Sequence, residues 1–282
     1  MSKTRHLLGL SGGKDSAALA IYMRHNFPEI DMEYYFTDTG KELPEVYSFL
    51  GKLEGYLGKE IVRLNSDRDF DYWIELYDHF LPSPRQRWCT VNMKLKPFEN
   101  WIKPTLNSGG QIFSYVAIRA DEPERTGYVS KKKGITVKMP FRENEINKPD
   151  VKKILEESGV GYPDYYKWRS RSGCTFCFFQ RKIEWVRLMQ EHPDAFQEAV
   201  EYEKNAIEHD SPFTWTEGES LLDLCKKERV EQIERDHAIK LQKEKMRIRS
   251  NPLLDDEDFD KNDIDELYGD DEGGGACLVC HK

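Results

Sequence analysis

The stretch Ser11-Gly12-Gly13-Lys14-Asp15-Ser16 constrains this chain more than any other part of its sequence. A short apolar run, residues 6–10, precedes it, and an apolar pattern typical of a helix, residues 17–23, follows it. We therefore expect a buried strand, a glycine turn and a helix start in direct succession. Such a turn aims backbone N–H groups and the positive end of a helix at one point, and its glycines let an anion approach closely. Lys14 adds a positive charge and the two serines add hydroxyl donors, so the stretch predicts a phosphate-binding loop.

Strand and helix patterns alternate through the first half of the chain. The predicted strands cover residues 7–10, 31–37, 61–64, 111–118 and 135–141, and the predicted helices between them cover 15–25, 45–57, 70–80 and 91–102. This alternation predicts an α/β fold with a doubly wound parallel sheet. Ligands of such sheets bind at the carboxyl ends of the strands. Ser11, Asp38 and Arg119 each follow a predicted strand directly, so we expect all three at that edge.

The second half of the sequence has mostly helical patterns. The predicted helices cover residues 151–158, 180–191, 194–209 and 221–249. We divide the chain into a nucleotide-binding domain at 1–145, a helical C-terminal region with a Cys-x-x-Cys motif at 146–250, and an acidic tail at 251–282 that ends in Cys-x-x-Cys-His.

The charge of the chain is concentrated in that tail. Residues 255–272 carry a net charge of −10 against −9 for the whole chain, so the remainder is close to neutral at +1. A block of like charges with few apolar residues predicts a tail that is disordered by itself. No apolar run approaches the length of a membrane span, and the first residues lack the apolar core of a signal peptide. We therefore expect a cytoplasmic protein without a membrane partner.

Three motifs resemble one protein superfamily. The S-G-G-x-D-S pattern of residues 11–16 is not a Walker A loop but resembles the PP-loop of ATP pyrophosphatases. Residues 38–45, Asp-Thr-Gly-Lys-Glu-Leu-Pro-Glu, look like the D-T-G-x-x-x-P-E segment of the phosphoadenosine phosphosulfate reductase branch of that superfamily. Residues 118–125, with Arg119 and Arg125, are similar to the arginine-bearing strand end of the same branch.

The resemblance implies a fold of the adenine nucleotide alpha hydrolase type and an enzyme that splits ATP between its α and β phosphates. It implies that ATP and its pyrophosphate are bound by Ser11, Gly12, Gly13, Lys14, Asp15 and Ser16, with Thr37 and Asp38 near the adenosine. The catalytic residues that we expect are Lys14, Asp15, Arg119 and Cys89, with Mg²⁺ bridging the phosphates.

The sequence differs from the reductases of this branch in its cysteines. The Glu-Cys-Gly-Ile/Leu-His context of their catalytic cysteine is missing, and Cys89 stands alone where the adenylyl-sulfate enzymes have paired cysteines. Cys89 followed by Lys94 and Lys96, and later the segment Arg171-Ser172-Gly173-Cys174-Thr175-Phe176-Cys177, resemble the ATP pyrophosphatases of DNA phosphorothioation. Those enzymes hand sulfur to the DNA backbone.

The cysteines allow three interpretations. Cys89, Cys174 and Cys177 could ligate an iron–sulfur cluster, or the two Cys-x-x-Cys pairs, the second being Cys277 and Cys280, could share a zinc ion. In the third interpretation the tail pair is a mobile redox or persulfide carrier on its Gly-Gly-Gly hinge, residues 273–275.

The most specific prediction is an ATP pyrophosphatase that adenylates its substrate for sulfur transfer in DNA phosphorothioation. A cysteine desulfurase would donate the sulfur, and a nucleic acid, with DNA favoured, would accept it. The alternatives are an adenylyl- or phosphoadenylyl-sulfate reductase-like enzyme, a tRNA thiolation enzyme, and an ATP-binding sensor without catalytic activity.

Overall fold

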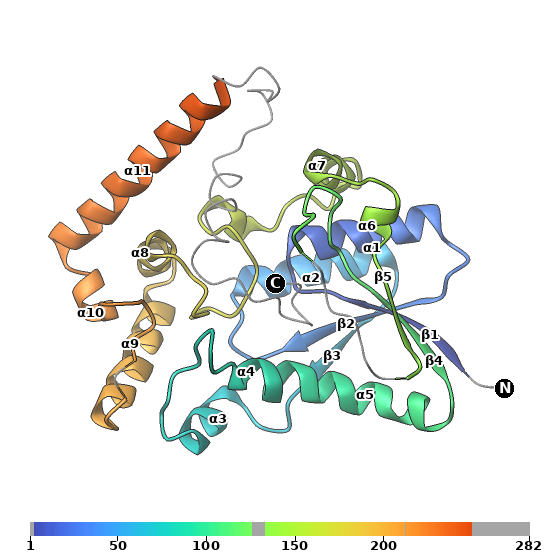
Figure 1. Ribbon diagram of the computed structural model, residues 1–282, viewed down its shortest axis with the longest axis horizontal. Helices are drawn as coiled ribbons and strands as arrows, with labels where there is room; N and C mark the ends of the chain where they lie inside the picture. Colours follow the sequence, from blue (N-terminus) through green and yellow to red (C-terminus); the bar gives the residue numbers. More distant parts are fainter. Residues whose placement is uncertain (1–2, 126–132, 212, 250–282) are drawn as a thin grey trace. The chain divides into compact units, whose positions relative to one another are not determined.

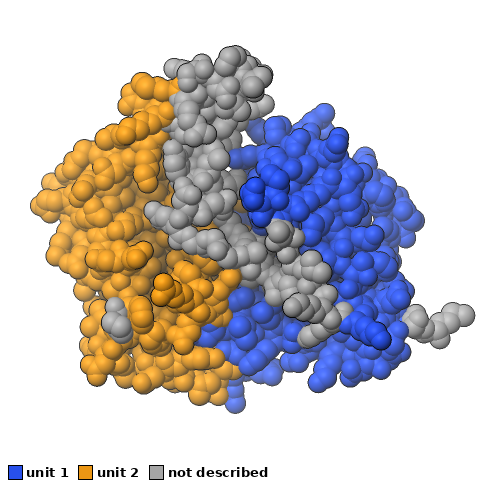
Figure 2. Space-filling view, in the orientation of Figure 1, with its two compact units in different colours: residues 1–70, 88–165, 275–282 blue, residues 71–87, 166–274 orange. Residues whose placement is uncertain are grey.

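The structure of the chain is a computed structural model that describes residues 3–125, 133–211 and 213–249. Its described residues divide into two compact units (Figure 2): unit 1 comprises residues 3–70, 88–125 and 133–165, and unit 2 comprises 71–87, 166–211 and 213–249. These units are not continuous in sequence, because residues 71–87 group with the C-terminal unit and residues 146–165 with the N-terminal one. The division into domains stays a prediction. The predicted tail, with Cys277 and Cys280, lies outside the described residues.

Unit 1 is built on a sheet of five parallel strands. They are β1 (Thr4–Gly9), β2 (Met32–Asp38), β3 (Ile61–Asn65), β4 (Gln111–Tyr115) and β5 (Ile135–Lys138), in the spatial order β3-β2-β1-β4-β5. The chain moves outward from β1 through β2 to β3 and then returns to the other side of β1 for β4 and β5. This reversal places a topological switch point between the carboxyl ends of β1 and β4, where open parallel sheets bind ligands.

Helices cover both faces of this sheet, which confirms the predicted doubly wound α/β class (Figure 1). Helices α1 (Lys14–Asn26) and α2 (Pro44–Leu57) lie on one side, where α7 (Lys148–Glu157) packs against α1, and α5 (Lys96–Asn107) covers the other. Leu7 faces the α5 side in a cluster with Ile102 of that helix, and the pleat turns the equally buried Leu8 to the opposite face.

Local sequence signals set the helix ends in unit 1. Pro44 occupies the first turn of α2, and Gly58 ends that helix in the left-handed conformation at φ 61°. Asn147 and Asp150 form a capping box at the start of α7.

Several predicted boundaries in unit 1 are wrong. Strand β4 ends at Tyr115 instead of residue 118, and β5 ends at Lys138 because Pro140 starts the short helix α6 (Pro140–Glu143). The single helix predicted over residues 91–102 is two elements, a π-helical turn η1 (Val91–Leu95) and α5, and the short helix α4 (Trp88–Thr90) precedes them. A π-turn inserts an extra residue per turn, which the apolar period does not reveal.

Unit 2 is helical, as predicted for the C-terminal region. It contains α8 (Lys182–Glu191), α9 (Pro193–Glu208), α10 (Leu221–Leu224) and α11 (Lys227–Arg249), with most of α3 (Phe70–Leu76) and the end of the 3-10 turn η2 (Asp164–Lys167). The predicted helix over 221–249 is interrupted at residues 225–226, and the one over 70–80 ends at Leu76, where Asp78 and His79 adopt positive φ. An aromatic core forms around Trp215, whose ring lies 5.4 Å from Phe176 and 6.0 Å from Trp185.

Glu219 connects α11 to α8 within unit 2 and supplies a testable pH dependence. Its carboxylate accepts two hydrogen bonds of 2.7 Å from Arg229 and pairs with Lys182 at 2.5 Å. The hydrogen bond from Arg229 lowers the pKa of Glu219 to about 2, against the opposing effect of burial. A carboxylate with a depressed pKa stabilises the fold above its ordinary pKa, and the stabilisation is lost as the pH falls through the depressed value.

We expect Glu219→Gln to lower the free energy of unfolding of unit 2 at pH 7 by on the order of 2 kcal/mol. The difference from the unsubstituted protein should shrink as the pH falls from about 4.5 to about 2, measured by thermal unfolding across that range. Asp31→Asn is the control, because Asp31 pairs with Lys59 while 93% exposed and should contribute little. A difference between the Glu219→Gln and unsubstituted proteins that does not change with pH would contradict the prediction.

None of the helices in the described part of the chain is both long enough and apolar enough to span a membrane.

Candidate active site

The loop at residues 11–16 forms the turn that the sequence predicts, between β1 and α1 of unit 1. Gly13 is the N-cap of α1, and Asp15 lies in its first turn. The loop is braced by serine hydroxyls: the Ser16 hydroxyl accepts a 3.2 Å bond from the Ser11 amide, and the Ser11 hydroxyl accepts a 3.3 Å bond from the Gly13 amide. The first N–H groups of a helix have no partner within that helix, so the start of α1 presents donors beside the loop.

Gly12 is fixed by two constraints that no other residue type meets together. Its φ is 75°, and a Cβ atom placed on it would lie 2.6 Å from Cγ1 of Val46 in α2. Its carbonyl oxygen accepts a 2.8 Å hydrogen bond from the hydroxyl of Tyr165, which is fully buried and 153 residues further along the chain. No sequence signal marks Tyr165, because it lies in a segment of glycine, proline and aromatic residues without a recognisable period.

Removing the Tyr165 hydroxyl tests whether this bond holds the loop. Tyr165→Phe leaves the buried Gly12 carbonyl without its donor, so we expect the free energy of unfolding of unit 1 to fall by about 1–2 kcal/mol. Nucleotide affinity, measured by titration calorimetry, should fall severalfold because the loop loses a fixed position. Tyr34→Phe, in the buried part of β2, is the matched control and should leave nucleotide affinity unchanged. Equal affinities in Tyr165→Phe and Tyr34→Phe would show that the bond is structural only.

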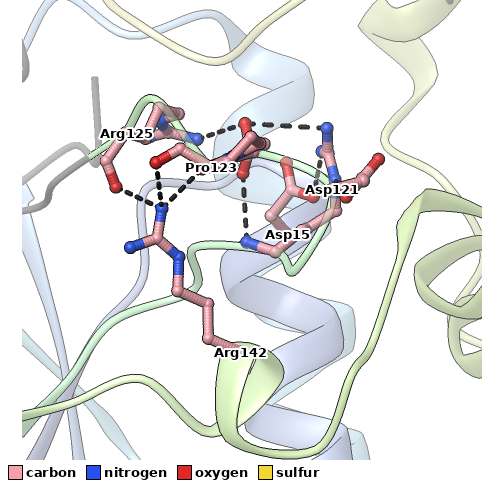
Figure 3. Close-up of polar contacts among 7 residues, drawn as sticks. Asp15, Asp121, Pro123, Arg125 and Arg142 are labelled. Carbon is pink, nitrogen blue, oxygen red and sulfur yellow. Dashed lines mark hydrogen bonds and ion pairs between the residues drawn. The ribbon is translucent and has the colours of Figure 1, made fainter.

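Asp15 and Arg119 join the two sides of the topological switch point. Their side chains are 104 residues apart in sequence and form a 2.8 Å ion pair, with Asp15 on α1 after β1 and Arg119 just after β4. The Arg119 guanidinium is buried and also bonds Asp121 at 2.9 Å and lies 3.6 Å from Glu122 (Figure 3). Three carboxylates thus surround one buried guanidinium at the carboxyl edge of the sheet.

The segment that carries Arg119 is held in place by a second arginine. Arg142 of α6 donates to the carbonyl oxygens of Glu122 at 2.5 Å, Pro123 at 3.5 Å and Arg125 (Figure 3). Arg125 in turn pairs with Glu122 at 2.6 Å. A motif in the sequence marks Arg119 and Arg125, whereas none marks Arg142.

The end of β2 carries a second set of polar contacts. The Asp38 carboxylate accepts bonds from the Gly40 amide at 2.8 Å and the Tyr47 hydroxyl at 2.7 Å. Burial and the bond to Asp38 raise the pKa of Tyr47 far above its ordinary value, so this hydroxyl stays protonated. Thr37 is buried in β2 beside Asp38. The structure therefore places both predicted adenosine-side residues at the carboxyl edge of the sheet.

A buried carboxylate that was not predicted as a site residue follows this strand end. Glu42 accepts a 3.0 Å bond from the Thr39 hydroxyl and lies 3.9 Å from the Lys94 ammonium on the π-turn η1. Because π-turns often occur at functional sites, this contact extends the candidate site toward α4, where the half-buried Cys89 lies.

Cys174 and Cys177 lie in unit 2, in a loop lined by arginines. A hydrogen bond from the Cys174 thiol lowers the pKa of the Cys177 thiol well below its ordinary value, and the charges of Arg171 and Arg169 act in the same direction against the effect of burial. Burial raises the pKa of the neighbouring Glu184, but the guanidiniums of Arg181, Arg171 and Arg169 outweigh it and keep this carboxylate ionised.

The predicted metal sites stay predictions. Cys89 belongs to unit 1 and the Cys174–Cys177 pair to unit 2, and each unit is described by itself. Across the ranges that the structure covers, no group of three or more His, Cys, Asp or Glu side chains is arranged to hold a metal ion. ATP binding and catalysis likewise stay predictions for the residues of the loop, the end of β2 and Arg119. These residues lie at the same edge of the sheet, as a shared site would require.

Comparison with known proteins supports part of this interpretation. Residues 5–141 match the family model of the phosphoadenosine phosphosulfate reductase domain. This match supports a domain of the phosphoadenosine phosphosulfate reductase-like superfamily over the first half of the chain, the part that carries the loop, Arg119 and Cys89. It shows no particular closeness to the enzymes of DNA phosphorothioation.

Two uncharacterised proteins of Methanocaldococcus jannaschii are similar to a larger part of the chain. They are 26% and 24% identical to it over 200 and 197 residues, which is 68% of this chain in both cases. The chain spans less than half the length of these relatives, 40% and 46%. Among solved structures, the phosphoadenylyl-sulfate reductase of Candida auris, in a phosphate complex, aligns with a TM-score of 0.46 and 14% identity over 62% of this chain and 82% of that one.

Proposed function

We propose that the protein is an ATP pyrophosphatase that adenylates a substrate for sulfur transfer. The observation that carries this proposal is the ion pair between Asp15 and Arg119 across the topological switch point. It joins a phosphate-binding turn to a buried arginine at the edge of the sheet where nucleotides bind in folds of this type. The match of residues 5–141 to the phosphoadenosine phosphosulfate reductase domain supports adenine nucleotide chemistry.

The roles of the loop residues follow from their chemistry. The N–H groups at the start of α1 and the Ser11 and Ser16 hydroxyls would hold the β and γ phosphates, and Lys14 would add a positive charge. These donors are in place before the reaction, so they stabilise the charge that develops on the leaving pyrophosphate. Arg119 would bind the anionic substrate whose oxygen attacks the α-phosphorus.

Magnesium suits the donors of this edge. Asp15 and Asp121 supply carboxylate oxygens beside the loop, and Mg²⁺ in nucleotide sites takes one or two carboxylates together with phosphate oxygens. When bound, the ion would neutralise phosphate charge.

The second step of the proposed reaction is sulfur transfer to the adenylated substrate. Adenylation converts a substrate oxygen into a leaving group, AMP, which a sulfur nucleophile can displace. We propose a nucleic acid as the acceptor, with the DNA backbone favoured, and a cysteine desulfurase as the source of sulfur. The similarity of Cys89, Lys94, Lys96 and residues 171–177 to phosphorothioation enzymes supports this choice.

Product analysis tests the proposed reaction. The purified chain is incubated with Mg²⁺ and α-³²P-labelled ATP, with and without duplex DNA, and the products are separated by chromatography. We expect one pyrophosphate, measured with a coupled phosphatase assay, for each labelled AMP, whether the AMP is free or attached to the acceptor, and faster formation of both when an acceptor is present. Formation of ADP and phosphate, or binding of ATP without any products, would contradict the proposal, and the second outcome would favour a nucleotide sensor.

A sulfonucleotide reductase-like activity is the second candidate, favoured by the family match over residues 5–141. Such an enzyme would consume adenylyl sulfate or phosphoadenylyl sulfate with a thiol and release sulfite without ATP. The same preparation assayed for sulfite from these substrates separates the two candidates.

A further inference from the structure

Positive charge is concentrated in one segment of unit 2, residues 167–187. The segment has six lysine and arginine residues and one acidic residue, Glu184, so its net charge is +5. Three of its arginines are almost completely buried, with exposed fractions of 0% for Arg169 and 8% for both Arg171 and Arg181. Guanidinium groups stay protonated in proteins, and a buried charge is costly unless an opposite charge lies beside it. These arginines therefore need anionic partners.

The carboxylate of the segment is already engaged by other groups. One oxygen of the fully buried Glu184 accepts bonds from the amide and the hydroxyl of Ser170, at 2.8 Å and 2.7 Å. The other accepts the backbone amide of Arg181 at 3.0 Å, and the ion pair of Glu184, at 3.6 Å, is with Nη2 of the same arginine. Glu184 is therefore the direct partner of Arg181.

Arg169 is bound to neutral groups. It donates to the carbonyl oxygens of Gly173 at 3.1 Å and Cys174 at 2.9 Å. Among the residues that the structure describes, no carboxylate pairs with it, and its Nε, although buried, has no hydrogen-bond acceptor. Leaving a buried charged donor unsatisfied is costly. This guanidinium therefore indicates an anion that comes from outside the chain.

The cluster reaches the surface of unit 2 at a half-buried aromatic ring. The guanidinium carbons of Arg171 and Arg87 lie 5.0 Å and 5.2 Å from the centre of the Phe179 ring, and Phe179 packs against Phe178 at 4.4 Å. Arg87 belongs to unit 2 through the segment 71–87. A guanidinium that lies over an aromatic ring keeps its N–H donors in its own plane, where an anion can accept them.

We propose that the arginine cluster of unit 2, formed by Arg87, Arg169, Arg171 and Arg181 around Phe179, is a phosphate-binding site separate from the loop at residues 11–16. The fork of a guanidinium matches the oxygens of a phosphate group. Arg87 and Arg171 would donate to the phosphate, and the buried charge of Arg169 would add attraction from behind them.

Two sources can supply this chemistry, free phosphate and the phosphodiester backbone of a nucleic-acid strand. If the phosphate belongs to a strand, the site would dock the acceptor, and that use rests on the proposed function. Binding itself requires neither ATP nor pyrophosphate release.

Hydrogen–deuterium exchange of the full chain, resolved into peptides, tests the site. The probe is inorganic phosphate in one arm and a short single-stranded oligothymidylate without terminal phosphates in the other. We expect slower exchange in the peptides that cover residues 83–87 and 169–181, with an affinity taken from the protection of these peptides. Protection by inorganic phosphate identifies a free anion as the ligand, and protection by the oligothymidylate alone identifies a strand.

Two substitutions test the roles of the arginines. Arg171→Gln and Arg87→Gln should each weaken the affinity by about tenfold, because each removes a charged donor. Arg24→Gln is the matched control and should leave the affinity unchanged. It also removes a guanidinium over a ring, since Arg24 lies 5.3 Å from the ring centre of Tyr56, but in unit 1. Circular dichroism shows whether each variant is folded.

Three outcomes would overturn the proposal. They are exchange that neither probe slows in these peptides, affinities that stay unchanged in both folded variants, and an iron–sulfur cluster bound in stoichiometric amount and lost in Cys174→Ser, since an anionic cluster would then be the partner of the arginines. Pyrophosphate release from ATP is measured separately on the same preparations. A protein that releases pyrophosphate without protection of these peptides would refute this site alone, and the reverse result would refute the proposed function alone.

Discussion

Asp15→Ala should lower the rate of pyrophosphate release from ATP by about 1,000-fold while the chain stays folded. The carboxylate lies in the first turn of α1 and holds the Arg119 guanidinium at 2.8 Å, so its removal disconnects the turn at residues 11–16 from the arginine across the switch point. The guanidinium keeps Asp121 and Glu122 as partners, which should limit the loss of stability. Pyrophosphate is measured with a coupled phosphatase assay, and the fold by thermal unfolding.

Glu33→Gln is the matched control for this prediction. Glu33 of β2 pairs with Arg5 of β1 at 2.7 Å, so the variant also breaks an ion pair between a carboxylate and a buried arginine of unit 1. These residues lie toward the amino ends of their strands, away from the loop. We expect a comparable change in unfolding temperature but unchanged pyrophosphate release. If Asp15→Ala keeps its full rate, the loop does not serve the proposed reaction.

Gly12→Ala should produce the largest loss of stability of any single substitution proposed for unit 1, about 2–4 kcal/mol, and should also abolish pyrophosphate release. Two effects add at this position. Alanine is strained at a φ of 75°, and its Cβ would lie 2.6 Å from Cγ1 of the buried Val46, so the loop or α2 must move. The shift of the unfolding midpoint in urea measures the effect.

Gly109→Ala separates the two effects. Gly109 has the same φ of 75°, but a Cβ there would meet nothing within 4 Å. This control should therefore cost only the backbone strain, about 1 kcal/mol. Adding Val46→Ala to Gly12→Ala removes the clashing methyl group and should recover part of the lost stability, which a double-mutant cycle quantifies. Equal midpoints for Gly12→Ala and Gly109→Ala would show that the contact with Val46 is not rigid.

The local part of this architecture could be predicted from the sequence. The turn at residues 11–16, the helix that follows it and the alternation of strands and helices depend on glycine conformational freedom, apolar period and capping, all of which act over a few residues. For the same reason the positions of Asp38 and Arg119 after strands could be predicted, and with them the edge of the sheet where the candidate site lies. The end of β5 and the course of the helix at 91–102 could not, because a proline and a π-turn changed the local path.

The contacts that bring the residues of the candidate site together are visible only in the tertiary structure. The sequence by itself determined the turn at residues 11–16 and the α/β class, since short-range sterics and periodic burial dictate both. It did not determine that β4 pairs with β1, that Arg119 therefore reaches Asp15 over 104 residues, or that Tyr165 returns over 153 residues to hold the Gly12 carbonyl. Such pairings depend on how the whole sheet packs against its helices, because the fold of lowest free energy is the one that buries the most apolar surface overall. The segments that meet in this way carry no periodic sequence pattern that would predict their contact.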